Sequence, residues 1–330
     1  MRQFEYAAPK STQQAVALLG ANWSQAQILA GGTDLLGLMK DDIESPNRVV
    51  NIKDVGGLTR IGIGPDAYTI GALGRLQEIA DNAEIRKHFP MLAFAVDDAA
   101  SPQIRNMATI GGNLCQRPRC WYFRSGFGLL AVQDGKSMVE AGDNRNHAII
   151  ANEGPAKFVS PSTIAPALIA YNASVTIYGP KGARFEGLDK FYRIPKSEHE
   201  REHDLQPNEM ITEIHISTLE PPPTHTAQYE IRQKAAFDWP MALASVALWM
   251  SGGTVNKANV VLGAVAPIPW VSKEAAAELE GKPLNNKTIE AAAKAAVSIA
   301  KPLSKNGYKV QLTQVAVKRA LLQAAEGARA

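Results

Sequence analysis

Short apolar runs alternate with longer amphipathic stretches over the first 55 residues of the chain. A short apolar run is typical of a strand, whereas apolar residues spaced by three and four positions are typical of a helix. Ser11-Thr12 precedes the first amphipathic stretch and suits a helix N-cap. The alternation predicts a small α/β subdomain of β-α-β-α-β order. Its strands are expected at residues 4–7, 26–30 and 49–52, and its helices at 13–19 and 35–39.

The next stretch, from residue 56 to about 180, begins with two apolar runs that predict a β-hairpin. Gly62-x-Gly64 between them has the appearance of a G-x-G motif, but Pro65-Asp66 and a strand follow it, so we interpret it as the hairpin turn. Amphipathic segments further on predict helices and strands in mixed order. The strands are expected at 59–63, 67–72, 173–178 and 210–216, and the helices at 76–82, 88–99 and 165–171.

The C-terminal region, residues 227–330, changes from strand patterns to helix patterns along its length. Residues 241–250 are apolar almost throughout, which is typical of either a buried helix or a buried strand. The later segments are rich in alanine, the best helix former. A small sheet backed by helices fits this order. Strands are expected at 228–233 and 258–265, and helices at 272–279, 286–300 and 310–325.

Two double-glycine stretches, Gly31-Gly32 and Gly111-Gly112, each lie beside a threonine. The first stands between a predicted strand and a predicted helix, where glycine allows close backbone approach and a helix start offers free N–H groups to a phosphate. Taken alone, it is better explained as a tight turn with Thr33 or Asp34 as an N-cap. Because the second stretch repeats the chemistry, the pair favours a clamp on both sides of a pyrophosphate. Neither fits G-x-G-x-x-G, so a Rossmann unit is not supported.

The motifs AGGTDLL at 30–36 and TIGGN at 109–113, with SPQIRN at 101–106 before the second, resemble a known family. This is the flavoprotein (medium) subunit of the molybdenum hydroxylases, which include xanthine dehydrogenase and carbon monoxide dehydrogenase. The similarity runs over essentially the whole chain. The run QRPRCWYFR at 116–124 is similar to a subgroup of aldehyde-oxidoreductase-type flavin subunits.

The resemblance implies an α+β fold of three parts. A PCMH-type, vanillyl-alcohol-oxidase-like FAD-binding region of two subdomains precedes a C-terminal three-stranded sheet with helices, and residues 241–250 become a strand of that sheet. The implied parts are 1–55, 56–220 with an insertion around 115–161, and 221–330, the last resembling the C-terminal domain of the carbon monoxide dehydrogenase flavoprotein.

The resemblance also implies how FAD is held. Backbone N–H groups of both glycine loops would bind the pyrophosphate, and the side chains of Thr33 and Asp34 would add contacts to phosphate or ribose. Thr163 stands where the family has an aspartate, so the charge is gone and a hydroxyl remains. Ile211 would pack near the flavin ring. The expected FAD-binding residues are Leu29, Ala30, Gly31, Gly32, Thr33, Asp34, Leu35, Ser101, Thr109, Gly111, Gly112, Asn113, Thr163, Ile211 and Lys234.

A family lysine near Tyr229 would also reach the flavin, and its counterpart is open in this sequence. Lys234 and Arg232 are candidates, while Glu230 occupies one plausible alignment of the position. We find no catalytic residue set and predict no metal ligand. This suits a flavin subunit, because the cofactor carries the redox chemistry while the protein supplies binding and tuning.

The irregular tract from Cys115 to Pro161 mixes arginines, aromatic residues and glycines. In the resembling subgroup it carries extra cysteines that ligate a [4Fe–4S] cluster, which needs four soft ligands. The whole chain has two cysteines, Cys115 and Cys120, so it cannot supply four cysteine ligands. We expect no complete iron–sulfur cluster in this chain and interpret both cysteines as buried free thiols. The alternative is a two-cysteine site completed by His147 or by another chain.

Composition excludes several other classes of protein. With 330 residues and 45% hydrophobic content, the chain should form two or three compact units. A net charge of +3 does not suggest nucleic acid, and no apolar run reaches membrane-spanning length. We expect a cytoplasmic location, or a periplasmic one if a partner's signal exports the chain. The charge run at 196–203 predicts a solvated loop, and its histidine pair, His199 and His203, is a weak metal motif.

These observations leave three functions open. The favoured one is the FAD subunit of a molybdenum hydroxylase that oxidises an aldehyde or N-heterocycle. Its expected partners are a large molybdopterin-binding subunit, a small [2Fe–2S] subunit, and an external electron acceptor such as NAD⁺, oxygen or a carrier protein. The alternatives are a stand-alone FAD oxidase on the same fold and a non-catalytic assembly subunit that has lost flavin.

Overall fold

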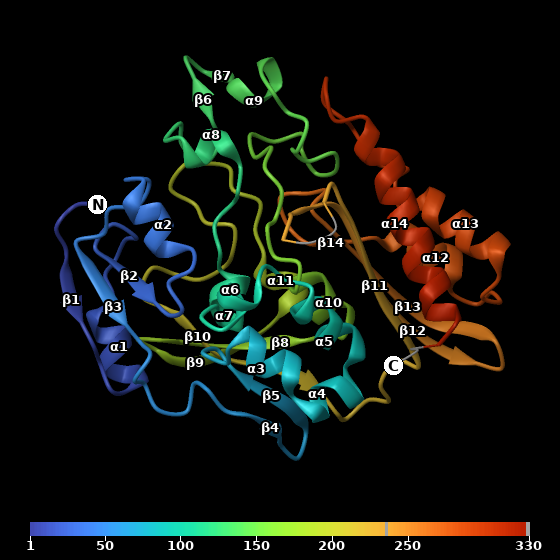
Figure 1. Ribbon diagram of the computed structural model, residues 1–330, viewed down its shortest axis with the longest axis horizontal. Coiled ribbons are helices and arrows are strands. Elements are labelled where there is room, and N and C mark those ends of the chain that lie inside the picture. Colours follow the sequence, from blue (N-terminus) through green and yellow to red (C-terminus); the bar gives the residue numbers. More distant parts are fainter. Residues whose placement is uncertain (235–236, 328–330) are drawn as a thin grey trace.

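Three β-sheets, met in order along the chain, form the frame of the molecule (Figure 1). The computed structural model describes residues 1–234 and 237–327. The sheets have three, five and four strands, and a separate two-stranded hairpin lies in the irregular tract. Helices and strands are mixed throughout, as the α+β prediction required.

The first sheet confirms the β-α-β-α-β order of the N-terminal residues. Its three strands are parallel in the order β1-β3-β2, so the last strand lies in the middle. The side-chain hydroxyl of Ser11 accepts a hydrogen bond from the Gln14 N–H and caps α1. Strand β2 ends at Leu29 and leads directly into the first glycine loop. The elements are β1 (Glu5–Ala7), α1 (Thr12–Leu18), β2 (Ala26–Leu29), α2 (Leu35–Lys40) and β3 (Arg48–Asn51).

The second sheet is antiparallel, in the order β4-β5-β10-β8-β9. The Gly64 N–H donates to the Ala67 carbonyl at 2.8 Å, which confirms the predicted hairpin turn. The second glycine loop is the start of a short helix, α7, capped by Thr109. The elements are β4 (Ile61–Ile63), β5 (Ala67–Gly71), α3 (Leu76–Asp81), α4 (Ala83–His88), α5 (Pro90–Asp97), α6 (Pro102–Arg105), α7 (Ile110–Leu114), α10 (Ala165–Ala170), β8 (Ser174–Gly179), β9 (Gly182–Gly187), α11 (Leu188–Phe191) and β10 (Met210–Ser217).

The structure differs from the predictions for this region in two respects. The helix expected at 88–99 begins only at Pro90, because proline suits the first turn of a new helix, and a separate helix α4 precedes it behind the Asn82 cap. The stretch after residue 181, for which no element before residue 210 was predicted, contains β9 and α11. Strand β9 lies at the edge of its sheet, where one face is open and the apolar pattern is weak.

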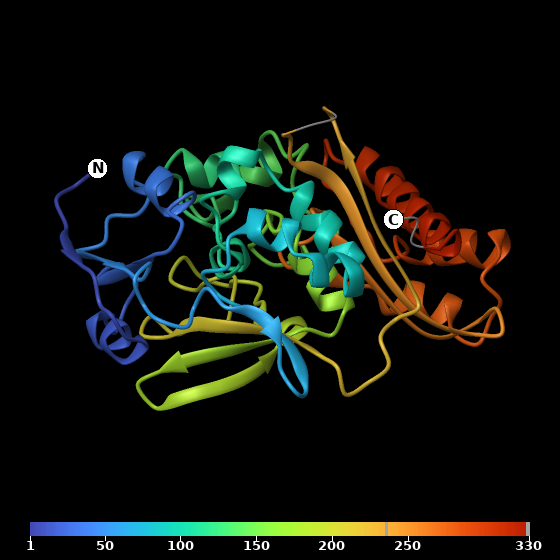
Figure 2. The same ribbon diagram turned by 60° about the horizontal axis from the view of Figure 1, so that its bottom comes forward.

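The irregular tract projects beside the C-terminal sheet and carries few regular elements (Figures 1 and 2). It packs a small core of its own around Phe123, Leu129 and Phe158, together with Leu38 of α2. The tract therefore packs against the N-terminal subdomain. Its elements are α8 (Trp121–Arg124), β6 (Val132–Gln133), β7 (Lys136–Ser137) and α9 (Met138–Ala141).

The C-terminal sheet has three long antiparallel strands, as expected, and a two-residue fourth strand at its edge. Residues 241–250 lie within β12, whose inward side chains are fully buried. The helix expected at 286–300 ends at Ala295. Helices α12, α13 and α14 cover one face of the sheet (Figure 1). The elements are β11 (His225–Arg232), β12 (Pro240–Ser251), β13 (Thr254–Gly263), β14 (Trp270–Val271), α12 (Lys273–Leu279), α13 (Asn286–Ala295) and α14 (Tyr308–Ala325).

A search of the described residues finds no helix with both the length and the apolar character needed to cross a bilayer. The domain boundaries at 55 and 220 stay predictions.

Candidate functional site

The first glycine loop is in backbone contact with the residues that lead into the second. A Cβ atom built on Gly31 would lie 2.1 Å from the carbonyl oxygen of Met107, two residues before Thr109 of the second loop. A Cβ atom built on Gly111 would lie 2.9 Å from the Cβ atom of Ala72. Gly32 has a φ of +81°, a backbone conformation that favours glycine. Glycine is therefore required at Gly31, which touches the lead-in to the second loop, and at Gly111, which packs on Ala72. This juxtaposition is the geometry that a clamp on both sides of a pyrophosphate needs.

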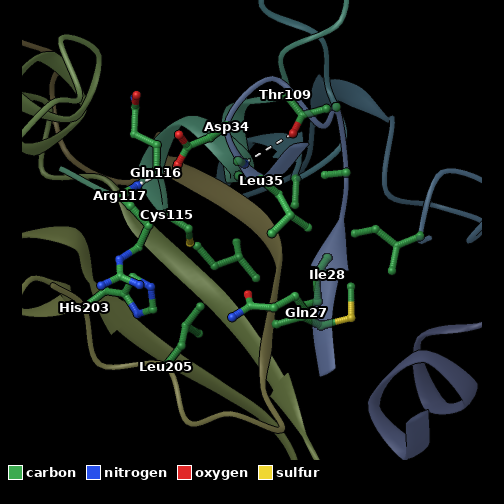
Figure 3. A pocket seen from close by; sticks show the side chains of 18 of the residues that line it. Gln27, Ile28, Asp34, Leu35, Thr109, Cys115, Gln116, Arg117, His203 and Leu205 are labelled. Carbon is green, nitrogen blue, oxygen red and sulfur yellow. Dashed lines mark hydrogen bonds between the residues drawn. The ribbon is translucent and has the colours of Figure 1, made fainter. Parts of the chain in front are cut away.

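A cavity of about 170 Å³ opens beneath the two loops (Figure 3). Most of the expected FAD-binding residues line it, although they come from separate elements. Five do not: Leu29, Ser101, Asn113, Thr163 and Lys234. The expected residues that do line this first cavity are Ala30, Gly31, Gly32, Thr33, Asp34, Leu35, Thr109, Gly111, Gly112 and Ile211.

The Asp34 carboxylate ties the first glycine loop to the irregular tract. One oxygen accepts the backbone N–H of Arg117 at 2.8 Å, and the other accepts the Arg124 guanidinium at 2.8 Å. The guanidinium of Arg119 lies 3.1 Å from the same second oxygen. In this arrangement the acceptor capacity of Asp34 is used within the protein. Asp34 thus positions the loop and the tract against each other.

Ion pairs form one wall of the first cavity. Arg117 pairs with Glu44 and with Glu202, the latter at 3.1 Å, and Arg201 pairs with Glu44 at 2.8 Å. Burial raises the pKa of Glu202, while Arg117 acts in the opposite direction. This cluster could not be predicted from the sequence, because its members are far apart in the chain and belong to polar stretches.

His203 lies in the same wall, buried to 8% exposure. The expectation of a solvated loop at 196–203 was therefore wrong for its end, although His199 is exposed. The reason is tertiary: the ring stacks on Phe191 at 5.5 Å and meets the edge of Trp23 at 5.9 Å. Burial, assisted by the Arg117 cation, lowers the pKa of His203 to about 3, so the ring is neutral at physiological pH.

The structure contains a second cavity of about 190 Å³. It lies between the irregular tract and the C-terminal sheet, and its lining includes Arg119, Trp121, Thr163, Trp239 and Lys309. Two contacts tie it to the region of the glycine loops, the first of them to a residue that lines the first cavity. Arg119 reaches Asp34, and the Ser162 hydroxyl donates to the Asn113 side-chain oxygen at 2.6 Å. Of the expected residues, Thr163 thus belongs to the second cavity, and Asn113 supports it through Ser162.

Lys309 is a buried amine at this second cavity. It is 1% exposed, and its ammonium group donates to the carbonyl of Ala264 at 2.7 Å and to that of His147 at 3.2 Å. Burial lowers the pKa of Lys309 to about 7. The sequence reasoning missed this residue, since one lysine in an amphipathic helix is ordinary.

Comparison with known proteins gives a consistent result over the whole chain. Residues 2–218 match the family described as "FAD binding domain in molybdopterin dehydrogenase", and residues 227–324 match "CO dehydrogenase flavoprotein C-terminal domain". The chain is 31% identical to the aldehyde oxidoreductase FAD-binding subunit PaoB of Escherichia coli (strain K12), over 98% of this chain and 99% of that one.

The chain is also 29% identical to the carbon monoxide dehydrogenase medium chain of Hydrogenophaga pseudoflava, over 97% of this chain and 96% of the relative. A solved structure of carbon monoxide dehydrogenase from that organism superimposes with a TM-score of 0.77 at 28% identity, covering 98% of both chains. The chain belongs to the FAD-binding subunits of the molybdenum hydroxylases. It is a subunit of an oxidoreductase, and the expected PCMH-type fold with its C-terminal domain is confirmed.

The residues of this flavin subunit fit FAD. The paired glycine loops form a cradle in which a Cβ atom would collide with backbone, and a buried imidazole nitrogen of His203 has no partner among the described residues. When bound, FAD supplies the electron-transfer chemistry. The glycine loops would hold the pyrophosphate region, and the second cavity would offer charge and aromatic surfaces.

The two cysteines of this flavin subunit lie at different places. Both are free thiols of intermediate exposure rather than fully buried ones. Cys115 lines the first cavity, whereas Cys120 lines the second, with its sulfur 3.1 Å from Nε2 of His147. The structure thus brings His147 to one cysteine and not to both. In the described part of the chain no group of three or more His, Cys, Asp or Glu residues is arranged to hold a metal ion.

The candidates for the family lysine lie elsewhere. Lys234 and Arg232 line an open hollow between β11 and α14, separate from both cavities. Arg232 pairs with Glu230, whose pKa burial raises to about 7, and with Asp98. A hydrogen-bonded path connects this hollow to the second cavity, because Gln228 donates to Glu230 at 2.8 Å and to the Thr163 carbonyl at 3.3 Å.

Proposed function

We propose that this chain carries FAD within a multi-subunit molybdenum hydroxylase that oxidises an aldehyde or an N-heterocycle. In this role, electrons from iron–sulfur centres of a partner reach an external acceptor by way of the FAD-binding subunit. The proposal is supported by one cavity that residues of both glycine loops line, with the first loop in backbone contact with the lead-in to the second. The relatives named for aldehyde and carbon monoxide oxidation support this class of reaction.

The two cavities support a placement of the cofactor. The first has apolar walls beneath the glycine loops and would take the adenine half of FAD, with the pyrophosphate at Gly31 to Leu35 and Thr109 to Asn113. The second would take the flavin ring, because Trp121 and Trp239 offer stacking surfaces. In this placement Ile211 contacts the adenine half, which differs from the expectation that it packs near the flavin ring.

The second cavity also suits the redox role. Arg119 and Lys309 put positive charge beside the ring, and positive charge stabilises the reduced, negatively charged form of a flavin. This placement puts the ring between the irregular tract and the C-terminal sheet.

The expected partners are a large molybdopterin-binding subunit and a small [2Fe–2S] subunit, and the acceptor is NAD⁺, oxygen or a carrier protein. Purification of the intact assembly, followed by molybdenum, iron and flavin analysis, tests this. Molybdenum and iron that copurify with the flavin chain support the proposal. A flavin-containing chain that is isolated alone and turns over a substrate with oxygen points to the stand-alone oxidase.

Substitution of Gly112 by leucine tests the flavin site itself. A Cβ at Gly112 meets only the Thr109 hydroxyl, at 3.0 Å, so the chain should fold while the larger side chain fills the cavity. The matched control is Gly37→Ala, because a Cβ at Gly37 has open space around it. We expect the Gly112→Leu chain to be purified without FAD and the control to retain one FAD per chain. Stoichiometric flavin in Gly112→Leu refutes the clamp, and a colourless wild-type chain supports an assembly subunit that has lost flavin.

A further inference from the structure

Strand β11 forms one edge of the C-terminal sheet, because in the described chain it pairs with β12 alone (Figure 1). It is eight residues long, and its register with β12 shifts only at its end, between Ile231 and Arg232. Within the described residues, the backbone of β11 has no hydrogen-bond partner outside its ladder with β12. The outer N–H and C=O groups of such a strand form a template on which another strand can pair.

An open hollow of about 420 Å³, which we call the β11 hollow, follows this edge. Four consecutive residues of the strand, 229–232, line it. Side chains of consecutive strand residues point to opposite faces of a sheet, so a hollow that all four line must run along the edge of the strand. Helix α14 contributes two apolar side chains, Leu312 and Val315. The β11 hollow therefore offers an extended segment both backbone partners and an apolar surface.

The charges of the β11 hollow favour an acidic occupant. Its charged residues are three cations, Arg232, Lys234 and Arg319, and two carboxylates, Asp98 and Glu230. Both carboxylates pair with Arg232. The guanidinium of Arg319 instead lies over the ring of Tyr229, 5.2 Å from its centroid, and donates a hydrogen bond to its hydroxyl oxygen. Among the described residues neither Arg319 nor Lys234 forms an ion pair, so both cations can pair with carboxylates of a partner.

We propose that the β11 hollow binds an extended acidic segment of a partner subunit, which adds to the four-stranded C-terminal sheet beside β11. This inference rests on the proposed function, since it takes its occupant from the assembly that contains this chain. Strand addition supplies main-chain hydrogen bonds for affinity, while the side chains of the added segment supply specificity. Apolar side chains would lie on Leu312 and Val315, and carboxylates would pair with Arg319 and Lys234. A second copy of this chain suits the site less well, because it would place one cationic hollow against another.

Hydrogen exchange followed by mass spectrometry tests the added strand. The FAD-loaded chain is measured alone and in the purified assembly, and the exchange of residues 225–232 is compared. About half of the amides in an edge strand point away from its neighbour and exchange rapidly. We expect these amides to exchange at least about tenfold more slowly in the assembly, because they gain hydrogen-bond partners. The amides that already bond to β12 should change little.

The Arg319→Gln variant tests the acidic character of the occupant. It removes one cation of the β11 hollow, so the dissociation constant from the partner subunits should rise about fivefold at low salt, the scale of one partly exposed ion pair. The matched control is Lys318→Gln, because Lys318 is the preceding residue of α14, lies outside the lining of the hollow and pairs with Glu290. This control should keep the wild-type dissociation constant. Sedimentation at low and high salt measures both, and the effect of Arg319→Gln should shrink as salt screens the charges.

An assembly in which the β11 amides exchange as fast as in the isolated chain overturns the inference and leaves the proposed function intact. Equal dissociation constants for Arg319→Gln and Lys318→Gln refute the acidic segment. Slow exchange of β11 that accompanies dimerisation of the isolated chain assigns the edge to a second copy and also overturns the inference. A chain that forms no assembly with a molybdenum-containing subunit refutes the proposed function, and the inference falls with it.

Discussion

The two buried histidines should make this protein sensitive to mild acid. Burial lowers the pKa of His203 to about 3 and that of His147 to about 4, and nearby Arg117 and Lys309 respectively add to the effect. In an unfolded chain the pKa of histidine is about 6.5. Between these values the unfolded state binds more protons than the folded state, so the free energy of unfolding falls as the pH falls.

The magnitude follows from these pKa values. At pH 7.5 both histidines are neutral in either state, so they contribute almost nothing to a pH dependence. At pH 5.0 an unfolded histidine is mostly protonated while the folded one stays neutral, which costs about 2 kcal/mol per residue. The pair should therefore remove about 4 kcal/mol, a large part of the 5–15 kcal/mol typical of a folded protein.

Urea unfolding of the apoprotein at pH 7.5 and pH 5.0, followed by tryptophan fluorescence, measures this loss. Carboxylates also titrate near pH 5, so the decisive quantity is the difference between wild type and His203→Phe. The variant should lose about 2 kcal/mol less than wild type between the two pH values. His199→Phe changes an exposed histidine of the same segment and should behave as wild type.

An equal loss in wild type and His203→Phe would refute the reasoning. It would mean that His203 is protonated in the folded protein at pH 5, despite its burial against Phe191 and Trp23. We expect the free energy of unfolding to fall by the same amount in His199→Phe and wild type, and by a smaller amount in His203→Phe.

Three further predictions follow from other contacts. Gly31→Ala should destabilise the chain by about 1–3 kcal/mol and lower its FAD content, since the new Cβ meets backbone at 2.1 Å; thermal unfolding with flavin analysis checks this. Asp34→Ala should cost about 3 kcal/mol and open the tract at Arg117 and Arg124 to trypsin; unchanged cleavage would contradict this. Lys309→Met should lower the flavin midpoint potential by about 30 mV at pH 6, which equals about 1.4 kcal/mol for two electrons. The decrease should be smaller at pH 8.5, because the pKa of Lys309 is about 7 and the amine is then mostly neutral. Redox titration at both pH values measures this difference.

Much of the fold could be predicted from the sequence because its local patterns are strong. The β-α-β-α-β order of the first 55 residues and the Gly64 hairpin turn were both anticipated, whereas the apolar pattern at 241–250 left helix and strand open until the family resemblance favoured a strand. Each depends on periodicity, capping or turn chemistry, which act over a few neighbouring residues. The two glycine loops were also evident, since double glycines beside threonines are visible without any tertiary information.

Tertiary structure alone decided which distant residues share a cavity. Asp34 is close in sequence only to the first glycine loop, yet its carboxylate accepts hydrogen bonds from Arg117 and Arg124 more than 80 residues away. His203 appeared to belong to a solvated charge run, but packing between Trp23 and Phe191 buries it beside the cavity. Burial and pairing between such distant segments leave no periodic trace in the sequence. For this reason the sequence by itself determined the family and the two glycine loops, while the neutral histidine and the charged wall required the folded chain.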